Sequence, residues 1–363
     1  MDPEVRNALR LGAYQILFTR IPGYAACNSS VELVRDAGNR RAPGFVNGVL
    51  RALVRGADDI SYPDPGKEPV RWISVTESHP EWMVQWWMDR NGFEDTLAWC
   101  RANNRPPESV LRINRLRADP GDLEPLGVKP CAHAPDGFVY RGGGNPAERE
   151  AYRKGLYSIQ SEASQLVTCA GGVDGAWRML DGCAGRGGKS TYLAELSGDA
   201  GEVLAVDIYP DKLRVLEAQS ERLGLKSVHT LSGDLRALEP ISGSRDLVVL
   251  DVPCSGLGTI GREADARWHK SPEMLRDLPD LQLDLLRAGA PWVRPGGLLL
   301  YVTCSVAPEE NLQVVEGFLQ ASEEFLPENI DAALPGTAGY TMHLYPHVHG
   351  TDGSFAALMR RRQ

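Results

Sequence analysis

The pattern of apolar and polar positions changes near residue 156. From there onward, short apolar runs typical of buried strands alternate with amphipathic stretches of helical length. The predicted strands are Trp177–Asp181, Glu202–Asp207, Val228–Leu231, Asp246–Asp251 and Leu298–Val302. The predicted helices between them are Lys189–Leu196, Asp211–Leu223 and Met274–Val293. This alternation predicts an α/β fold, with a doubly wound, mostly parallel sheet of the Rossmann-like kind.

The first 150 residues follow a different pattern. Three amphipathic stretches between Asn7 and Arg55 predict short helices that bury little core by themselves. The segment after them is rich in Pro, Gly and Asp and predicts a linker. We therefore expect a helical segment over residues 1–56, a linker over 57–70, a small α+β domain over 71–150 and the α/β domain over 151–363.

Composition is that of an ordinary globular protein, with 42% hydrophobic and 24% charged residues. Lys and Arg total 39 against 48 for Asp and Glu, which gives a net charge of −9. A nucleic-acid-binding protein usually carries a basic surplus, so net charge alone argues against one. The apolar runs are much shorter than a membrane span, and the N-terminus lacks the pattern of a signal peptide. These features predict a soluble protein that does not enter a membrane.

The chain has seven cysteines, and no two of them have C-x-x-C spacing. An odd number without paired spacing argues against a disulfide framework and against a zinc site. We therefore expect a cytoplasmic protein that holds no metal.

One segment departs from the acidic background. Residues 101–117 contain five arginines and a single acid, Glu108. A short strand is expected from Ser109 to Ile113. The arginines are either a solvated charged face or a phosphate-binding surface for nucleic acid, and the sequence leaves both interpretations open. The RNA-binding candidates are Arg101, Arg105, Arg112, Arg115 and Arg117.

A glycine-rich turn joins the first predicted strand of the α/β domain to its helix, over Leu180–Thr191. Such a turn brings the backbone close to a ligand at a helix N-terminus. A Walker A loop requires its first glycine at position 183, which is Cys183, and a dinucleotide loop requires a glycine at Ala184. The looser acid-Gly-x-x-Gly-x-Gly pattern of S-adenosylmethionine (AdoMet) binding proteins fits from Asp181 to Gly187.

Acidic residues end three of the predicted strands. Asp207 follows Gly185 by 22 positions, where a carboxylate can bind ribose hydroxyls, and Asp234 follows the next strand, where it can face an adenine amino group. Asp251 ends the fourth strand. Because ligands bind at the carboxyl ends of parallel strands, the three acids predict one crevice for a nucleoside cofactor.

Two cysteines lie just beyond strand ends at the same crevice, Cys254 in Asp251–Thr259 and Cys304 in Tyr301–Ser305. A lone cysteine is usually a small buried apolar residue, but two at one edge suggest chemistry. Methylation of carbon 5 of a pyrimidine needs a thiolate that adds to carbon 6 and makes carbon 5 nucleophilic. A second thiol, or a water it positions, then helps to release the product.

Together these motifs resemble the RNA cytosine-5 methyltransferases, and among them the bacterial 16S rRNA methyltransferases of the RsmB (Fmu/Sun) group. The resemblance is carried by Cys183-Ala-Gly-Arg-Gly-Gly-Lys189, Asp251-Val-Pro-Cys-Ser-Gly-Leu-Gly258 and Thr303-Cys-Ser-Val-Ala-Pro-Glu-Glu-Asn311. It covers nearly the whole chain. Residues 7–53 resemble the second half of the NusB-like helical domain of that group, so a partial NusB-like segment is expected. The Asn104–Asn114 segment resembles the group's RNA-contacting region.

The resemblance implies a role for each site residue. Cys304 is the nucleophile, Cys254 the release cysteine, and Asp251 contacts the cytosine near N3, with Lys189 near the catalytic crevice. Asp207 holds the cofactor ribose and Asp234 its adenine. The cofactor loop consists of Cys183, Ala184, Gly185, Arg186, Gly187, Gly188 and Lys189. In the group this loop reads CAAPGGK, so Gly185 and Arg186 are departures, and the role of Arg186 is open.

The expected function is AdoMet-dependent methylation of carbon 5 of a cytosine in 16S rRNA, with RNA as partner. Two alternatives are a catalytically silent NusB-like RNA-binding protein of ribosome assembly and a tRNA cytosine-5 methyltransferase. A P-loop hydrolase is a further rival, but it lacks the Walker A glycine and leaves both cysteines unexplained.

Overall fold

A computed structural model describes residues 1–240 and 244–363, and it divides into two compact units, residues 1–76 and 77–363. The helices of the first unit are α1 (Pro3–Phe18), α2 (Gly23–Asp36), α3 (Pro43–Arg55) and α4 (Pro69–Thr76). Val34, Val46 and Leu50 are buried among α1, α2 and α3. The expected linker over 57–70 is shorter than predicted at its end, because α4 begins at Pro69.

A small antiparallel sheet lies in the second unit after the long helix α5 (Glu81–Asn103). Its strands, in spatial order, are β2 (Val128–Pro130), β3 (Gly137–Tyr140), β1 (Val110–Ile113) and β4 (Tyr157–Ile159), and the short helices α6 (Pro120–Leu123) and α7 (Glu150–Arg153) accompany it. β4 lies beyond residue 150, the expected end of this domain, because its residues pair with β1. The small sheet therefore continues directly into the α/β part.

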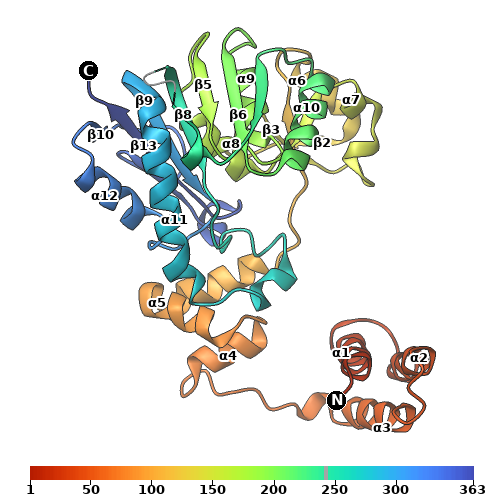
Figure 1. The fold of residues 1–363 in the computed structure, drawn as a ribbon. Helices are drawn as coiled ribbons and strands as arrows, with labels where there is room; N and C mark the ends of the chain where they lie inside the picture. Colours follow the sequence, from red (N-terminus) through yellow and green to blue (C-terminus); the bar gives the residue numbers. More distant parts are fainter. Residues whose placement is uncertain (241–243) are drawn as a thin grey trace. The chain divides into compact units, whose positions relative to one another are not determined.

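The large sheet has five parallel strands in the order β9–β8–β5–β6–β7, and several of them are visible side by side in Figure 1. These strands are β5 (Arg178–Asp181), β6 (Glu202–Asp207), β7 (Val228–Ser232), β8 (Arg245–Asp251) and β9 (Val293–Thr303). Antiparallel strands extend the sheet beyond β9, namely β10 (Phe325–Pro327), β11 (Thr337–Ala338), β12 (Thr341–Leu344) and β13 (Ser354–Arg361). The predicted α/β fold with a mostly parallel, Rossmann-like sheet is confirmed.

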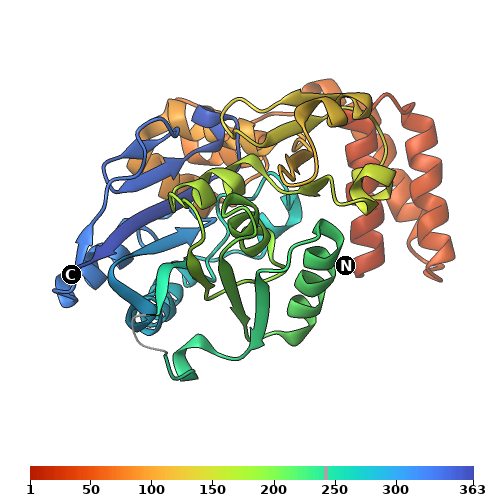
Figure 2. The same cartoon turned by 90° about the horizontal axis from the view of Figure 1, so that it is seen from above.

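Helices cover both faces of this sheet. Alternate residues of β8 point to opposite faces: Leu247 and Val249 pack in one core, and Val248 and Leu250 in the other. The first face is covered by α8 (Glu162–Cys169), α9 (Gly188–Leu196) and α10 (Pro210–Leu223), the last of these green beside β7 in Figure 2. The second face is covered by α11 (Met274–Gly289) and α12 (Leu312–Ala321).

Helix α11 ends earlier than the predicted Val293. Residues Ala290–Trp292 form a 3-10 turn with Pro291 inside it, and Val293 already pairs with Arg245 as the first residue of β9. The apolar run of the sequence thus covers a helix end, a turn and a strand start, which periodicity alone does not separate. The turn directs β9 back across the sheet beside β8, so that both strands end at the same edge.

Candidate active site

The glycine-rich loop between β5 and α9 is held in a conformation that only glycine adopts easily. Gly185 and Gly187 both have positive φ, 55° and 82°. A Cβ on Gly187 would lie 2.0 Å from Cδ1 of Leu216 in α10, so any side chain there would collide. A Cβ on Gly185 would meet no atom within 4 Å, so the loop faces open space on that side. One side of the loop is packed and the other is free to receive a ligand.

Two carboxylates at strand ends hold this loop in place. Asp207 accepts hydrogen bonds from the backbone N–H of Gly185 at 2.8 Å and of Tyr209 at 2.9 Å. Asp181 accepts from Oγ of Ser190 at 2.7 Å, and burial raises the pKa of Asp181 to about 6. The N–H of Cys183 also points to Asp181, at 3.4 Å. The loop backbone is therefore attached to the ends of both β5 and β6.

Asp234 follows β7, and its carboxylate is partly exposed. It accepts from the backbone N–H of Arg236 at 3.0 Å and pairs with the Arg236 guanidinium at 2.6 Å, which lowers the pKa of Asp234. Because β6 and β7 are neighbours, Asp207 and Asp234 stand at adjacent strand ends. Arg186, at the tip of the glycine-rich loop, is exposed, and its side chain has no hydrogen-bond or ion-pair partner within residues 1–240 and 244–363.

Asp251, at the end of β8, forms an ion pair with Lys189 of α9 at 2.6 Å between Oδ2 and Nζ. Burial alone would lower the pKa of Lys189, but the charge of Asp251 and the hydrogen bond to it outweigh burial and raise that pKa. Lys189 is therefore held as a cation. Its charge in turn helps to lower the pKa of the nearby Cys304.

The two cysteines predicted at the crevice lie side by side, with 3.2 Å between the sulfur atoms of Cys254 and Cys304. Either sulfur can donate in this contact; with Cys254 as the donor, the hydrogen bond lowers the pKa of Cys304 even though burial opposes the shift. The same hydrogen bond, with burial, raises the pKa of Cys254 well above its ordinary value. The pair thus has one sulfur that ionises readily and one that keeps its proton.

A buried glutamate joins the two cysteine loops. Glu310 has no exposed surface and accepts hydrogen bonds from the backbone N–H of Ser255 at 2.7 Å and from the hydroxyls of Ser255 and Ser305, each at 2.5 Å. Gln282 of α11 donates to it at 3.1 Å. Glu310 lies inside the Thr303–Asn311 motif, but no role was predicted for it. Its partner Ser255 belongs to a different motif, and the sequence does not show that the two residues meet.

The cysteine loops also meet the C-terminal hairpin at Gly258. Its N–H donates to the carbonyl of Cys304 at 2.9 Å, and its own carbonyl accepts from the N–H of Gly353 at 2.8 Å. A Cβ at this position would lie 2.0 Å from the Gly353 oxygen. The backbones of three segments therefore touch directly, and a side chain at residue 258 would separate them.

A cavity of about 430 Å³, which we call the catalytic cavity, opens at these side chains. Its walls include Cys304, Asp251 and Lys189 on one side. The opposite side is built from β1, β4 and the start of α8, with Val110, Gln160 and Ser164. A space of this size, with an ionisable thiol and an ion pair at one wall, fits a small polar ligand such as a nucleobase.

The five arginines of residues 101–117 do not form one surface, and the prediction that Arg112 binds RNA is wrong. Arg112 is fully buried, and its guanidinium forms two hydrogen bonds to Glu195 of α9, at 2.9 and 2.8 Å. It also donates to the carbonyl of Gly188 at 2.9 Å. β1 buries all four of its residues, so this arginine fastens the small sheet to the helix that follows the glycine-rich loop.

The other four arginines remain exposed. Arg101 pairs with Glu77 at 3.1 Å and Arg115 with Asp136 at 2.7 Å, while Arg117 donates to backbone carbonyls. Arg105 has no hydrogen bond or ion pair from its side chain to any residue that the structure describes. It is therefore the member of the set whose guanidinium is most available to a ligand.

The fold and this site define an AdoMet-dependent methyltransferase, as the comparisons with known families establish. Residues 173–360 match the model of the 16S rRNA methyltransferase RsmB/F family, so the chain belongs to that family. Residues 1–55 match the NusB family, and residues 79–139 match the ferredoxin-like domain of RsmF/B-like methyltransferases. The resemblance inferred from the motifs is confirmed, including the NusB-like helices and the methyltransferase class.

Curated relatives cover the whole chain. A probable ribosomal RNA small subunit methyltransferase B of Bacillus subtilis is 35% identical over 100% of this chain and 84% of its own length. Its counterpart from Synechocystis sp. is 33% identical over 99% of this chain and 83% of its own.

Among solved structures, that of PH0851 has a TM-score of 0.84 at 29% identity and covers 99% of this chain and 83% of its own. A methyltransferase homologue from Pyrococcus horikoshii has a TM-score of 0.69 at 26% identity, over 79% of this chain and 97% of its own. Within the described residues, no helix is long and apolar enough to cross a membrane, and no three His, Cys, Asp or Glu side chains form a group that would hold a metal.

Proposed function

We propose that this enzyme transfers the methyl group of AdoMet to carbon 5 of a cytosine in 16S rRNA. The observation that carries the proposal is Cys304 in the wall of a cavity that also holds Asp251 and Lys189, with the Cys304 sulfur 3.2 Å from that of Cys254. Membership of the RsmB/F family and the names of the relatives support 16S rRNA as the substrate.

The residues at the glycine-rich loop fit AdoMet. Asp207 and Asp234 offer carboxylate oxygens at adjacent strand ends, to accept from ribose hydroxyls and from the adenine amino group. The open space at Gly185 lies at the N-terminus of α9, where backbone N–H groups favour the carboxylate of the methionine part. When bound, AdoMet supplies an electrophilic methyl group on a sulfonium centre. The seven residues from Cys183 to Lys189 are thus proposed to surround it.

Cys304 is the proposed nucleophile, because it is the cysteine of the pair that lines the catalytic cavity. Its thiolate attacks carbon 6 of the cytosine and forms a carbon–sulfur bond. The electron pair of the carbon 5–carbon 6 double bond moves toward N3, which takes up a proton. We assign the contact with N3 to Asp251, and the ammonium of its partner Lys189 carries the proton that the pair delivers and takes back.

Cys254 is proposed to assist release. After carbon 5 has gained the methyl group, it carries one hydrogen too many for an aromatic ring. That proton leaves with the help of Cys254 or of a water molecule that Cys254 positions. The electrons re-form the ring double bond, the carbon–sulfur bond breaks, and the Cys304 thiolate is regenerated.

The experiment is to incubate the full chain with unmethylated 16S rRNA and AdoMet and to map 5-methylcytosine by bisulfite sequencing. Methylation of one cytosine is the expected result. Replacing Cys254 with Ala should trap a covalent protein–RNA complex that resists denaturants in a gel, whereas Cys304→Ala should form none. Trapping by Cys304→Ala alone would reverse the two roles.

A parallel reaction with unmodified tRNA tests the competing substrate. Methylation of tRNA and not of 16S rRNA would contradict the proposal while leaving the chemistry intact. AdoMet should also raise the melting temperature of the protein, and ATP with Mg²⁺ should not, which separates the methyltransferase from a nucleotide hydrolase. An rRNA substrate, with all seven cysteines as free thiols, also supports the cytoplasm as the place of action.

A further inference from the structure

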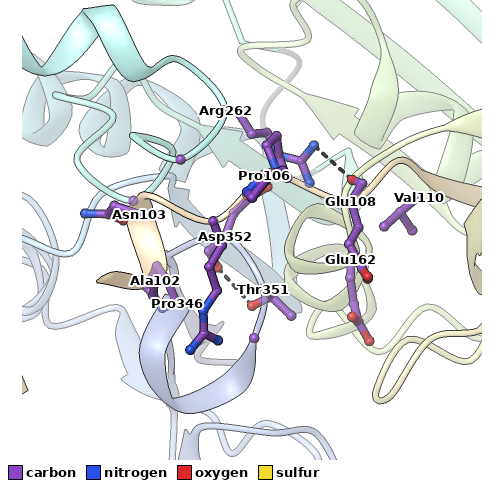
Figure 3. A pocket seen from close by; sticks show the side chains of 15 residues that line it. Ala102, Asn103, Pro106, Glu108, Val110, Glu162, Arg262, Pro346, Thr351 and Asp352 are labelled. Atoms are coloured by element: carbon purple, nitrogen blue, oxygen red, sulfur yellow. Dashed lines mark hydrogen bonds and ion pairs between the residues drawn. The ribbon is translucent and has the colours of Figure 1, made fainter. Parts of the chain in front are cut away.

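A second cavity adjoins the catalytic cavity, and we call it the flanking cavity (Figure 3). Its volume is about 330 Å³. Val110, Arg262 and Asp352 line both cavities, so the two share a wall. A ligand with one part at Cys304 can therefore place its next part in the flanking cavity.

Three segments that are distant in the sequence build the flanking cavity. Residues 102–108 comprise the end of helix α5 and the segment after it, Gly258 and Gly261 belong to the loop after Cys254, and residues 350–352 belong to the C-terminal hairpin. The rings of Pro106 and Pro107 form an apolar part of the wall. Glycines on the opposite side keep the space open. The cavity thus combines an apolar surface with backbone and polar groups, as sites for a flat polar base do.

Arg262 stands at the shared wall. Its Nε donates to Asp352 at 2.6 Å, and its Nη1 points to the carbonyl of Glu108 at 3.4 Å (Figure 3). These contacts fix the direction of the side chain and leave Nη2 without a partner among the described residues. About a third of the side chain is exposed, 34%. An oriented guanidinium with free N–H groups is well suited to bind a phosphate.

Arg105 is a second cation of the flanking cavity that is available to bind a ligand. Each acid in the wall already has donors: Glu108 pairs with Arg141, Asp352 pairs with Arg262, and Glu162 accepts from the backbone N–H groups of residues 133 and 134 at 2.6 and 3.0 Å. Arg105 has no such partner. The unpaired N–H groups at this cavity therefore come from Arg105 and from Nη2 of Arg262, and both can bind a phosphate group.

The segment that carries Arg105 is held rigidly. The buried Arg267 donates to Oδ1 of Asn104 at 2.8 Å and to the carbonyl of Ser78 at 3.0 Å. Asn104 in turn donates to the carbonyl of Glu77 at 2.9 Å. The backbone that carries Arg105 to the cavity is thus fixed before any ligand binds, which lowers the entropic cost of binding.

We propose that the flanking cavity binds the nucleotide covalently adjacent to the target cytosine. Arg262 contacts the phosphate that links the two nucleotides, Arg105 contacts the next phosphate, and the base lies against Pro106 and Pro107. The inference rests on the proposed function, because it requires a cytosine of an RNA chain at Cys304. A cytosine turned into the catalytic cavity stays covalently linked to its neighbouring nucleotides, and the flanking cavity adjoins the catalytic cavity at the shared wall.

The first test compares three single variants, Arg105→Gln, Arg262→Gln and Arg360→Gln. Arg360 is the matched control, an exposed arginine at the far end of β13 from the catalytic loops. Equilibrium binding of 16S rRNA is measured without AdoMet, so the result does not depend on methylation. Arg105→Gln and Arg262→Gln should each weaken binding about tenfold, the size expected for one charged hydrogen bond. The slope of log affinity against log salt should fall by about 0.7–0.9 for each lost phosphate contact.

Unchanged rRNA affinity in both variants, with Arg360→Gln also unchanged, would overturn the inference. The Arg105 side chain makes no hydrogen bond or ion pair with the described residues, so its variant tests RNA binding with little effect on folding. AdoMet-induced stabilisation then checks that Arg262→Gln is folded. Failure of the wild-type chain to methylate rRNA would instead refute the proposed function. The binding comparison would still show whether the flanking cavity binds RNA.

The second test locates the contact on the RNA. In an rRNA fragment that contains the mapped cytosine, the phosphate on its 5′ or on its 3′ side is replaced by a neutral methylphosphonate. On one side, the neutral linkage should weaken binding by the wild type about tenfold and binding by Arg262→Gln hardly at all, because the charge pair is already lost. Additive losses at both positions would contradict the assignment of Arg262 to the linking phosphate.

Discussion

The proposed cofactor side and the cysteine side of the candidate active site are held by different means. On the cofactor side, the Gly185–Gly188 loop is fixed by backbone N–H groups that bind Asp207 and Asp181, and by glycine conformations. On the cysteine side, two loops are joined by the buried carboxylate of Glu310 and by serine hydroxyls. One side relies on the backbone, and the other relies on a side-chain network.

The difference has a physical basis. The cofactor loop lies on a helix N-terminus, which offers N–H groups wherever the turn has that shape. The cysteine loops have no such support, and they must hold two sulfurs at 3.2 Å from different strands. A buried carboxylate without a cation partner among the described residues is costly, but it can accept four hydrogen bonds at once. Changes on the cysteine side should therefore affect the chemical step, and changes on the cofactor side should affect AdoMet binding or stability.

The largest effect is expected from Cys304→Ala. Without the thiolate, carbon 5 of cytosine does not become nucleophilic, and methyl transfer should fall by at least about a thousandfold. AdoMet binding, measured by calorimetry, should remain near the wild-type value because the loop on the other side is untouched. A large loss of AdoMet affinity would show that the two sides are not independent.

Arg112→Leu should lower the stability of the protein at the helix that follows the glycine-rich loop. It leaves Glu195 buried without its partner, and breaking a buried pair costs about 3–5 kcal/mol of unfolding free energy. Urea denaturation measures the loss. Arg115→Leu is the matched control, an exposed pair expected to cost less than about 1 kcal/mol. The double variant with Glu195→Leu should recover much of the stability, and an equal loss in the control would contradict the assignment.

Glu310→Gln should slow the chemical step about ten- to hundredfold, the effect of small misplacement of reacting groups. The amide places an N–H₂ group where the carboxylate accepts from Ser255, so the two loops lose their common acceptor. The measurement is kcat with saturating AdoMet and rRNA. Glu309→Gln, one residue earlier and partly exposed, is the control and should have little effect on kcat.

Asp207→Asn should weaken AdoMet binding about tenfold by removing a charged acceptor for ribose hydroxyls. Calorimetric titration of AdoMet measures the change. Asp211→Asn, on the exposed side of α10, serves as the control. Trapping of rRNA by the Cys254→Ala/Asp207→Asn double variant should persist at saturating AdoMet, and its loss there would show that Asp207 also supports the cysteines.

The smallest effect concerns pH. The Cys254 thiol lowers the pKa of Cys304, so the Cys304 thiolate is present at lower pH than for an ordinary thiol. Removing that donor in Cys254→Ala leaves burial and the charge of Asp251, which raise the pKa of Cys304, against the smaller opposing effect of the Lys189 charge. The rise of adduct formation with pH should then move to higher pH than in Cys254→Ser, whose hydroxyl can still donate. Identical pH profiles of adduct formation for the two variants would show that this hydrogen bond does not lower the pKa of Cys304.

Much of the α/β fold was predictable from the sequence. The strands that end at Asp207 and Asp251 were placed from short apolar runs closed by an acid, and these ends meet because the strands are parallel. The same rule brought Cys254 and Cys304 to one edge, where the structure finds them in contact. The glycine-rich loop was recognisable because its backbone conformation requires glycine at fixed positions.

The remaining features depend on pairs that the local sequence does not reveal. Arg112 belongs to a run of arginines that suggests a surface, yet its strand is buried and its partner Glu195 lies 83 residues further on. Glu310 and Ser255 are likewise 55 residues apart. The small sheet passed residue 150 because β4 pairs with β1, which no apolar pattern distinguishes from a loop. The periodicity of the sequence does not reveal which polar groups pair over such long distances along the chain.

The contact at Gly258 also constrains when the active site can be completed during synthesis. The loop with Cys254 and the loop with Cys304 are translated well before Gly353, whose N–H binds the Gly258 carbonyl. A nascent chain that ends before that residue has both sulfurs but lacks the backbone hydrogen bond that closes the junction. The two catalytic loops gain their final support only when the hairpin after residue 350 has emerged and β13 has paired with β9.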